Sequence, residues 1–472
     1  MSRIRHLLVP ALVAVAGSVL VAPSASAAPA PQCNTTNKQF TYVVLYDPGT
    51  PELQVDTELR AKCGEKVAYH PAIGVAVATS RNADFQAKIG AFRAYSGGRD
   101  VALSSWTSGS SNSSNLVGAK ENEETTDTVV ADKLSAQQWD MRAIHAPEAN
   151  KISGGSPSVT VGVLDSGIDP THPALKNALD PKASAGCTSG APDTTPAAWA
   201  PTTSDHGTHV AGTIAGKDTE HDFTGIAPGV KLASVKVVND NGLIFPEAAV
   251  CGFMWAANHH FAVTNNSYYI DPGMFYCSKE PGDAAAYEAV RRAVVHSTGQ
   301  GVLNIAAAGN SGFDVTQQTS DPNRPHAVDA SCGILPKAIE GVVTVSAIGY
   351  SGTKSPYSNF GPGQIEVTAP GGAYYDTPPA GQGASCPLST VLNGAYGTKC
   401  GTSMASPHAA GVAALLASRF PGAPPQKLTR LLEEQADPVP CDTVTAAQAC
   451  ADPAQNKSYY GHGRVNALDA VQ

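Results

Sequence analysis

Short runs of apolar residues alternate with longer segments of helical periodicity along the last two thirds of the chain. We predict strands within five of these runs: residues 159–164, 232–238, 261–264, 302–306 and 342–347. We predict helices between them at 206–215, 246–259 and 283–296. Because continuous apolar strands that alternate with helices form a parallel sheet covered on both faces, the region 131–472 is expected to adopt an α/β fold. Such sheets gather functional side chains at the carboxyl ends of their strands.

A shorter block at residues 38–103 has a different pattern. Its strand-like runs are 41–45 and 74–78. A helix-like segment at 84–95 has three apolar residues on one face: Phe85, Ile89 and Phe92. We predict a small α+β domain here.

Residues 104–130 separate the two blocks. They are rich in serine and asparagine and then acidic, with few bulky apolar side chains. Such a composition cannot bury a core, so we interpret the segment as a flexible, cleavable linker. An ordered surface loop is the alternative.

Residues 1–27 have the features of a secretion signal. Arg3 and Arg5 make the start basic, residues 7–21 are apolar, and small residues precede the predicted cleavage point after Ala27. A membrane anchor is the alternative, but the apolar run is short for a bilayer span and no second long run follows. We therefore expect a secreted, extracellular protein that does not contact a membrane after signal cleavage.

Export affects how the ten cysteines are interpreted. An even number in an oxidising compartment, without a C-x-x-C pair, favours disulfides over zinc. Cys441 with Cys450, and Cys386 with Cys400, are near enough in sequence to close small loops. The net charge of −9 over 472 residues gives no reason to expect nucleic-acid binding.

A hydroxyl stands near the start of an apolar helix, in the octet Gly-Thr-Ser-Met-Ala-Ser-Pro-His at residues 401–408. Ser403 would lie beside backbone N–H groups that have no partner within the helix and can stabilise negative charge on a substrate oxygen. Taken alone, a helix-capping serine is the simpler interpretation. A nucleophile would need a base, an orienting acid and a second oxyanion donor.

Three other segments supply such groups. Asp165 follows the strand at 159–164 and is suited to accept an imidazole N–H, although a capping role also explains it. His206 is suited to proton transfer near neutral pH; a metal pair with His209 is the alternative, but we expect His209 to be structural. Asn310 follows a buried strand, where its amide either donates to an oxyanion or forms a turn.

Together, these segments resemble the subtilisin-like serine peptidases, the subtilase family or peptidase family S8. The motifs are Val-Leu-Asp-Ser-Gly-Ile-Asp at 163–169, His-Gly-Thr-His-Val-Ala-Gly at 206–212, Ala-Ala-Gly-Asn at 307–310 and the octet at 401–408. The resemblance implies a three-layer fold with a mostly parallel sheet, and an endopeptidase that forms an acyl-enzyme. The implied catalytic residues are Asp165, His206 and Ser403, with Asn310 and the Ser403 N–H as oxyanion hole.

The resemblance also implies how the protein matures. The block at 38–103 resembles the inhibitor-I9-like propeptide of the family, which implies an autoprocessed zymogen whose propeptide assists folding and then inhibits. Protein or peptide substrates and this propeptide are the expected partners of a monomeric enzyme. The chemistry requires no cofactor. Family members often bind structural calcium, but no ligand set is identified, because loop acids such as Asp314, Asp321 and Asp329 are also explained by solvation. Pro336 falls near a family cis-proline position.

The substrate cleft departs from the family pattern. Where relatives carry Ser-Leu-Gly-Gly, this chain has tyrosines at 268 and 269. The expected lining residues are Ser267, Tyr268, Ala307, Ala308 and Gly309. Tyr268 and Tyr269 either narrow the cleft or pack beneath an inserted loop at 271–279. The alternative functions are a secreted pseudopeptidase that binds peptides and an N-terminal block that inhibits peptidases in trans.

Overall fold

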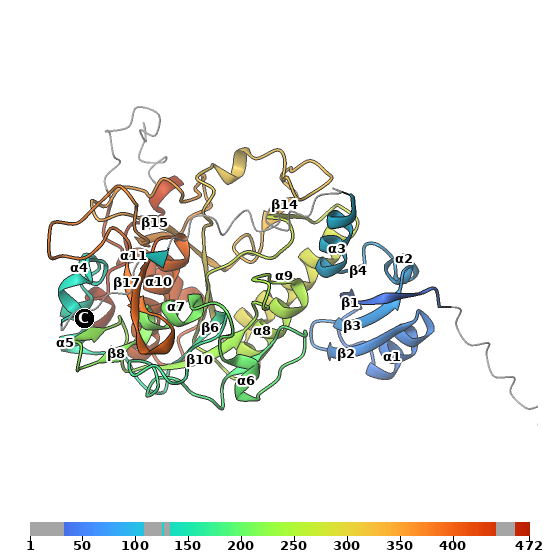
Figure 1. Cartoon of the computed structure of the whole chain (residues 1–472), viewed down its shortest axis with the longest axis horizontal. Helices are drawn as coiled ribbons and strands as arrows, with labels where there is room; N and C mark the ends of the chain where they lie inside the picture. Colours follow the sequence, from blue (N-terminus) through green and yellow to red (C-terminus); the bar gives the residue numbers. More distant parts are fainter. Residues whose placement is uncertain (1–32, 108–124, 127–132, 440–457) are drawn as a thin grey trace, which may run out of the picture.

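The computed structural model describes residues 33–107, 125–126, 133–439 and 458–472 (Figure 1). The expected signal segment and the expected Cys441–Cys450 pair lie outside the described residues, as does most of the expected linker.

A seven-stranded parallel sheet forms the centre of the larger part of the molecule, with strand order β16-β15-β13-β11-β6-β10-β7. Its strands are β6 (Thr160–Asp165), β7 (Ala185–Gly186), β10 (Lys231–Lys236), β11 (Val263–Asn266), β13 (Leu303–Ala307), β15 (Val343–Ile348) and β16 (Val367–Pro370). Each of the five predicted strands is confirmed to within two residues at either end. The two others, β7 and β16, are short.

Helices cover both faces of this sheet and give three layers. Helices α7 (His206–Ala215) and α10 (Thr402–Arg419) pack on one face, whereas α8 (Pro246–Asn258) and α9 (Asp283–Gly299) pack on the other. Successive side chains of β6 point to opposite faces, since Val163 belongs to the α10 side and Leu164 to the α8–α9 side. The prediction of a three-layer α/β fold is confirmed.

Residues 33–107 form an α+β unit, which we call the N-terminal unit. Its four-stranded antiparallel sheet has the order β2-β3-β1-β4. Its elements are β1 (Thr35–Leu45), α1 (Glu52–Ala61), β2 (Gly64–His70), β3 (Val75–Asn82), α2 (Phe85–Ile89), β4 (Ala94–Tyr95) and α3 (Gly97–Thr107). One sheet face packs on α1 and α2, and the other faces α8 and α9 (Figure 1).

The predicted helix at 84–95 is wrong in its second half. Helix α2 ends at Ile89, because Gly90 adopts φ +115°, a conformation that other residues rarely adopt. Phe92 lies beyond this end and is 56% exposed rather than buried. Helix α3 continues through the boundary expected at residue 103.

Four disulfides lie in the described part of the chain. The expected Cys386–Cys400 bond is present. Three further bonds join Cys33 to Cys63, Cys187 to Cys251 and Cys277 to Cys332. The Leu335–Pro336 peptide bond is cis, as expected. Among the helices of the described part of the chain, none has the length and apolar character needed to span a bilayer.

Candidate active site

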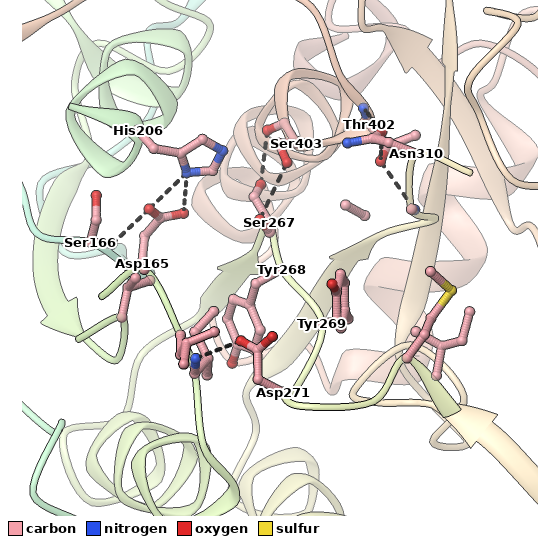
Figure 2. A pocket seen from close by; sticks show the side chains of 18 of the residues that line it. Asp165, Ser166, His206, Ser267, Tyr268, Tyr269, Asp271, Asn310, Thr402 and Ser403 are labelled. Carbon is pink, nitrogen blue, oxygen red and sulfur yellow. Dashed lines mark hydrogen bonds and ion pairs between the residues drawn. The ribbon is translucent and has the colours of Figure 1, made fainter. Parts of the chain in front are cut away.

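Asp165 and His206 contact each other in the pocket. Asp165 ends β6 and is 1% exposed, and its two oxygens lie 2.8 and 3.0 Å from Nδ1 of His206 at the start of α7. The same carboxylate accepts the backbone N–H of Ser166 at 2.7 Å. Because Nδ1 faces the carboxylate, Nε2 of His206 points toward Ser403 (Figure 2).

A glycine allows this close approach. A Cβ atom at Gly207 would lie 2.5 Å from the carbonyl oxygen of Gly167 and 3.1 Å from Cβ of Asp165. Any side chain there would push α7 away from β6. The backbone N–H of Gly207 donates to the Ser166 hydroxyl at 3.0 Å, which further holds the two segments together.

Ser403 lies in the first turn of α10 and lines the same pocket as Asp165 and His206. Its hydroxyl donates to the Ser267 carbonyl at 3.3 Å, and the Ser267 hydroxyl donates to the Ser403 carbonyl at 2.8 Å. This reciprocal pair connects the start of α10 to the end of β11. The Ser403 N–H belongs to the helix turn whose donors have no intrahelical acceptor.

Asn310 is oriented by Thr402, a residue that the sequence analysis did not single out. Oδ1 of Asn310 accepts the Thr402 hydroxyl at 2.7 Å and the Thr402 backbone N–H at 2.8 Å. The Thr402 hydroxyl also accepts the Gly309 N–H at 3.0 Å. With its oxygen held in this way, Asn310 turns its amide NH2 away from Thr402. The only available signal was that Thr402 lies inside the motif that contains Ser403.

The pocket brings most of the expected site residues together. Its lining includes Asp165, His206, Ser267, Tyr268, Ala307, Gly309, Asn310 and Ser403. Ala308 is the exception. It is fully buried, its N–H donates to the Val345 carbonyl at 3.0 Å, and its own carbonyl accepts the Asn359 amide at 3.2 Å. Ala308 therefore supports the cleft from behind.

The two tyrosines have different surroundings. Tyr268 packs with the α8–α9 cluster, and its hydroxyl donates to Asn266 Oδ1 at 3.0 Å. Burial raises the pKa of Tyr268, and the nearby charge of Asp165 adds to this. Tyr269 packs with Met274 and Phe275. The interpretation that a tyrosine packs against the inserted loop therefore holds for Tyr269, while both rings still line the pocket.

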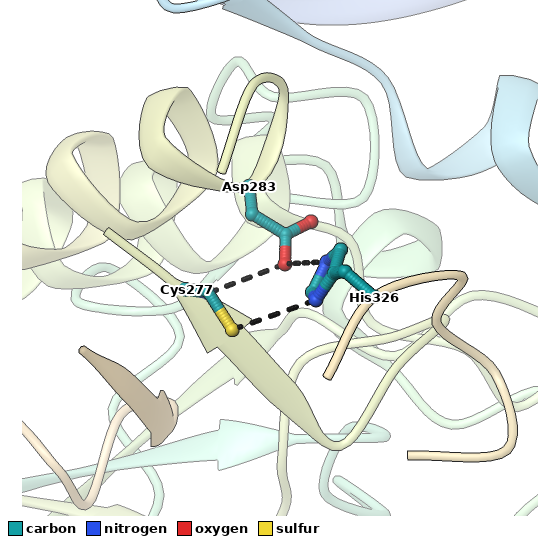
Figure 3. A group of neighbouring side chains, drawn as sticks. All are labelled: Cys277, Asp283 and His326. Atoms are coloured by element: carbon teal, nitrogen blue, oxygen red, sulfur yellow. Dashed lines mark hydrogen bonds and ion pairs between the residues drawn. The ribbon is translucent and has the colours of Figure 1, made fainter. Parts of the chain in front are cut away.

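The surroundings of His209 agree with a structural role. His209 is fully buried, and its Nε2 lies 3.2 Å from the Gly397 carbonyl. The loop acids Asp314, Asp321 and Asp329 each accept backbone N–H groups of nearby residues. Within the described ranges, the one group of His, Cys and acidic side chains with metal-like spacing is Cys277, Asp283 and His326 (Figure 3). Because Cys277 is in a disulfide, it offers no thiolate to a metal.

Comparison with known families decides what this pocket belongs to. The Peptidase S8 model, which describes the subtilase family, matches residues 156–463. The chain belongs to the subtilase family. It is therefore a serine-type endopeptidase, and its α/β fold is that of the subtilases.

Individual relatives agree. Subtilisin DY of Bacillus licheniformis is 30% identical over 315 residues, which span 67% of this chain and 91% of subtilisin DY. Fervidolysin of Fervidobacterium pennivorans is 29% identical over 318 residues, which span 65% of this chain but only 41% of fervidolysin. This subtilase therefore spans less than half of the length of fervidolysin.

A solved structure also resembles the whole fold. The epidermin leader peptide processing serine protease of Staphylococcus aureus superposes with a TM-score of 0.65 at 19% identity, covering 92% of this chain and 98% of that protein. At this identity the similarity concerns the fold. Its coverage exceeds the subtilase region, so the similarity extends into the N-terminal unit.

Proposed function

We propose that this subtilase is a secreted serine endopeptidase, made as an autoprocessed zymogen, in which Ser403 is the nucleophile. The observation that carries the proposal is the contact between the buried Asp165 carboxylate and Nδ1 of His206, with Nε2 directed at Ser403. A capping aspartate or a structural histidine would not need this arrangement. The relatives and the family match support the reaction class.

The proposed reaction is acyl transfer. Oγ of Ser403 attacks the carbonyl carbon of a peptide bond while its proton moves to Nε2 of His206. The intermediate then collapses, the C–N bond breaks, and the leaving amine takes the proton from His206. Water repeats the sequence on the acyl-enzyme and releases the carboxylic acid. Asp165 keeps Nδ1 protonated and stabilises the imidazolium.

The oxyanion of each tetrahedral intermediate needs donors that are already oriented. We assign this role to the amide NH2 of Asn310 and the backbone N–H of Ser403. The hydrogen bonds from Thr402 to Asn310 Oδ1 support the assignment, because they orient the amide before substrate arrives. No cofactor takes part in these steps.

We propose that the substrate chain lies between the segment containing Ser267 and Tyr268 and the segment from Ala307 to Gly309. Tyr268 and Tyr269 occupy space at this cleft, and Met274 and Ile334 make it apolar on one side. We therefore favour selective cleavage over broad digestion, and a protease that shares the fold is a leader peptide processing enzyme. The enzyme acts as a monomer outside the cell.

We further propose that the N-terminal unit is the inhibitory propeptide. Arg292 of α9 donates to the carbonyls of Tyr46 and Ile73 at 2.7 and 3.0 Å, and the Gly282 N–H donates to the Ala91 carbonyl at 2.6 Å. These contacts join its sheet to α9. They support a unit that assists folding of the subtilase region and leaves after the linker is cut.

Labelling with a serine-directed fluorophosphonate tests the nucleophile. Protein whose N-terminal unit has been removed should be labelled at Ser403, as located by peptide mapping. Ser403→Ala should abolish the label, and His206→Ala should slow labelling by about 10³-fold. A correctly folded protein without label at Ser403 would contradict the proposal and favour a peptide-binding pseudopeptidase. N-terminal sequencing of secreted protein tests maturation.

A further inference from the structure

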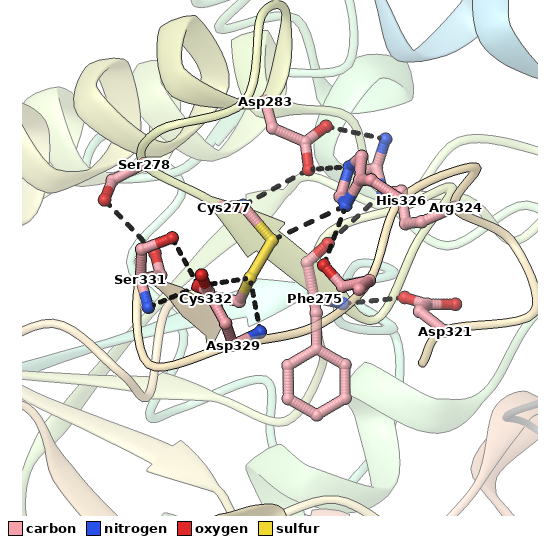
Figure 4. The surroundings of a disulfide bond; sticks show 11 residues. Phe275, Cys277, Ser278, Asp283, Asp321, Arg324, His326, Asp329, Ser331 and Cys332 are labelled. Carbon is pink, nitrogen blue, oxygen red and sulfur yellow. Dashed lines mark hydrogen bonds and ion pairs between the residues drawn. A yellow bond between two sulfur atoms is a disulfide. The ribbon is translucent and has the colours of Figure 1, made fainter. Parts of the chain in front are cut away.

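A second cluster of reactive groups surrounds the Cys277–Cys332 disulfide, away from Ser403. The bond joins directly opposed residues of two paired strands, β12 (Phe275–Cys277) and β14 (Cys332–Ile334). Cys277 is fully buried, whereas Cys332 is partly exposed. The exposed residue Asp329 lies beside Cys332 (Figure 4). A reagent from solvent would therefore reach the sulfur of Cys332 first.

An imidazole adjoins the buried sulfur of this bond. Nδ1 of His326 lies 3.7 Å from Sγ of Cys277, and its Nε2 lies 3.0 Å from a carboxylate oxygen of Asp283 (Figure 3). The other oxygen of Asp283 lies 3.0 Å from Arg324. An acid, an imidazole and a sulfur atom thus stand in a row, and Asp283 is only 5% exposed.

We propose that Cys277–Cys332 is a thiol-exchange site in which His326 serves the sulfur of Cys277. The co-reactant is a small thiol from the surroundings of the protein. Its thiolate attacks Sγ of Cys332, a new S–S bond forms, and the old S–S bond breaks. The electron pair goes to Cys277, and the imidazolium of His326 gives that sulfur its Nδ1 proton.

A second molecule of thiol completes the exchange. It attacks the mixed disulfide, releases the thiol of Cys332, and leaves as the oxidised small disulfide, so that two thiols reduce one disulfide. In the reverse direction, neutral His326 takes the proton of Cys277 and makes it the attacking thiolate. Asp283 acts as the positioning residue, since its contact with Nε2 leaves Nδ1 facing the sulfur and the Ala327 carbonyl, which lies 3.3 Å from Nδ1.

The charges around His326 come from several elements. Asp283 begins α9, Arg324 precedes His326 on the same loop, and Asp329 and Lys279 flank the disulfide. Asp100 of the N-terminal unit lies 3.7 Å from Arg324. Hydrogen bonds from Ser331, together with Lys279 and His326, lower the pKa of Asp329, so its negative charge stands near the sulfur that a thiolate attacks.

The exchange site is coupled to the substrate pocket through the strands that it joins. Ile334 ends β14 and lines the pocket that contains Ser403, and Met274, just before β12, lines it too. Opening the disulfide removes the covalent link across this wall and leaves the β12–β14 pairing and the surrounding non-covalent contacts to hold it. This consequence rests on the proposed function of the pocket, whereas the thiol chemistry does not.

The exchange itself is tested in the full chain carrying Ser403→Ala, which cannot cleave itself. Limiting dithiothreitol is added, free thiols are trapped with iodoacetamide at intervals, and peptide mapping follows each disulfide. We expect His326→Gln to slow opening of Cys277–Cys332 about tenfold or more while Cys33–Cys63 opens at an unchanged rate. Asp329→Asn, the matched control beside the other sulfur, should not slow it.

Two results would overturn the exchange site. The first would be that, in the parent chain, Cys277–Cys332 opens no faster than the buried Cys187–Cys251 bond. The other is an unchanged rate in His326→Gln. Because a glutamine at this site risks misfolding, Asp283→Asn provides a second variant that keeps the imidazole, and it should slow opening by a smaller factor.

The coupling is tested in the active enzyme. Peptide hydrolysis is measured before and after selective opening of Cys277–Cys332. The KM should rise several-fold while kcat changes less than about twofold, because Asp165, His206 and Ser403 lie on other elements. An unchanged KM after complete opening would refute the coupling. A protein that exchanges thiols normally but never hydrolyses peptides would refute the proposed function instead.

Discussion

The hydroxyl of Thr402 donates to Oδ1 of Asn310 at 2.7 Å, from the residue that directly precedes Ser403. The two ends of the proposed oxyanion hole are therefore set by one residue. Thr402 begins the helix that presents the Ser403 N–H, and it also orients the Asn310 amide.

Replacing Thr402 by valine should lower kcat. Valine keeps the shape and the backbone N–H but removes the hydroxyl that holds Asn310, so kcat should fall about tenfold with KM nearly unchanged. Thr402→Ser retains the hydroxyl and is the matched control. In Asn310→Ala, kcat should fall about 10²-fold, and adding Thr402→Val should then have little further effect. Additive losses would contradict the orienting role.

Asp165→Asn tests the orienting acid. The amide cannot hold His206 in the tautomer that leaves Nε2 able to accept a proton, so kcat should fall by about 10³- to 10⁴-fold while substrate affinity is retained. Steady-state kinetics on a peptide substrate measures the loss, and an unchanged melting temperature provides the folding control. A loss of less than tenfold would contradict the assigned role.

Glu247 predicts a pH-dependent stability. This glutamate in the first turn of α8 is 3% exposed, and burial raises its pKa from 4.5 to about 8. The folded chain then holds a proton that the unfolded chain has lost, so the free energy of unfolding falls as pH rises from about 4.5 to about 8. In Glu247→Gln, the free energy of unfolding should decrease by about 2–4 kcal/mol less over this pH range than in the parent chain. Thermal unfolding at pH 5 and pH 8 measures this difference in the Ser403→Ala chain with and without Glu247→Gln. The same change in stability between the two pH values in both proteins would contradict the prediction.

Tyr95 should govern how long the N-terminal unit stays bound. Arg324, whose side chain is 3% exposed, donates to the Tyr95 hydroxyl at 3.2 Å, and the Tyr95 and Tyr276 rings pack edge to face. Tyr95→Phe removes this charged hydrogen bond, so the dissociation rate should rise about tenfold. Native mass spectrometry can follow dissociation after an added protease cuts the linker of the Ser403→Ala chain. Phe92→Ala, at an exposed position, should leave the rate unchanged.

Ile334 should limit the size of side chain that the pocket accepts. Its side chain is 4% exposed and lines the pocket beside Met274. Ile334→Ala should raise the ratio of kcat/KM for large over small apolar side chains at one substrate position by about tenfold. A peptide library would identify that position. Leu243→Ala, which alters another part of the lining, should not change the preference at the same position.

Local pattern was sufficient for much of the fold. The predicted strand at 302–306 and helix at 206–215 depend on runs of apolar residues and helical periodicity, and both are present as β13 and α7. The helix predicted at 84–95 failed because periodicity continued past Gly90, whose left-handed conformation ended α2. Short strands such as β7 contain too few residues for any period to be visible.

The sequence alone determined the order of the chemical motifs and the α/β alternation. It also identified Asp165, His206, Asn310 and Ser403 as candidate site residues, because each lies in a motif made of neighbouring residues. Tertiary structure decided which distant groups meet. In the folded chain Thr402 contacts Asn310, His326 contacts Cys277 and Arg324 contacts Tyr95. Ala308 lies behind the cleft instead of lining it. Such contacts join residues as many as 229 positions apart, and only packing of the sheet, its helices and the N-terminal unit determines their distances.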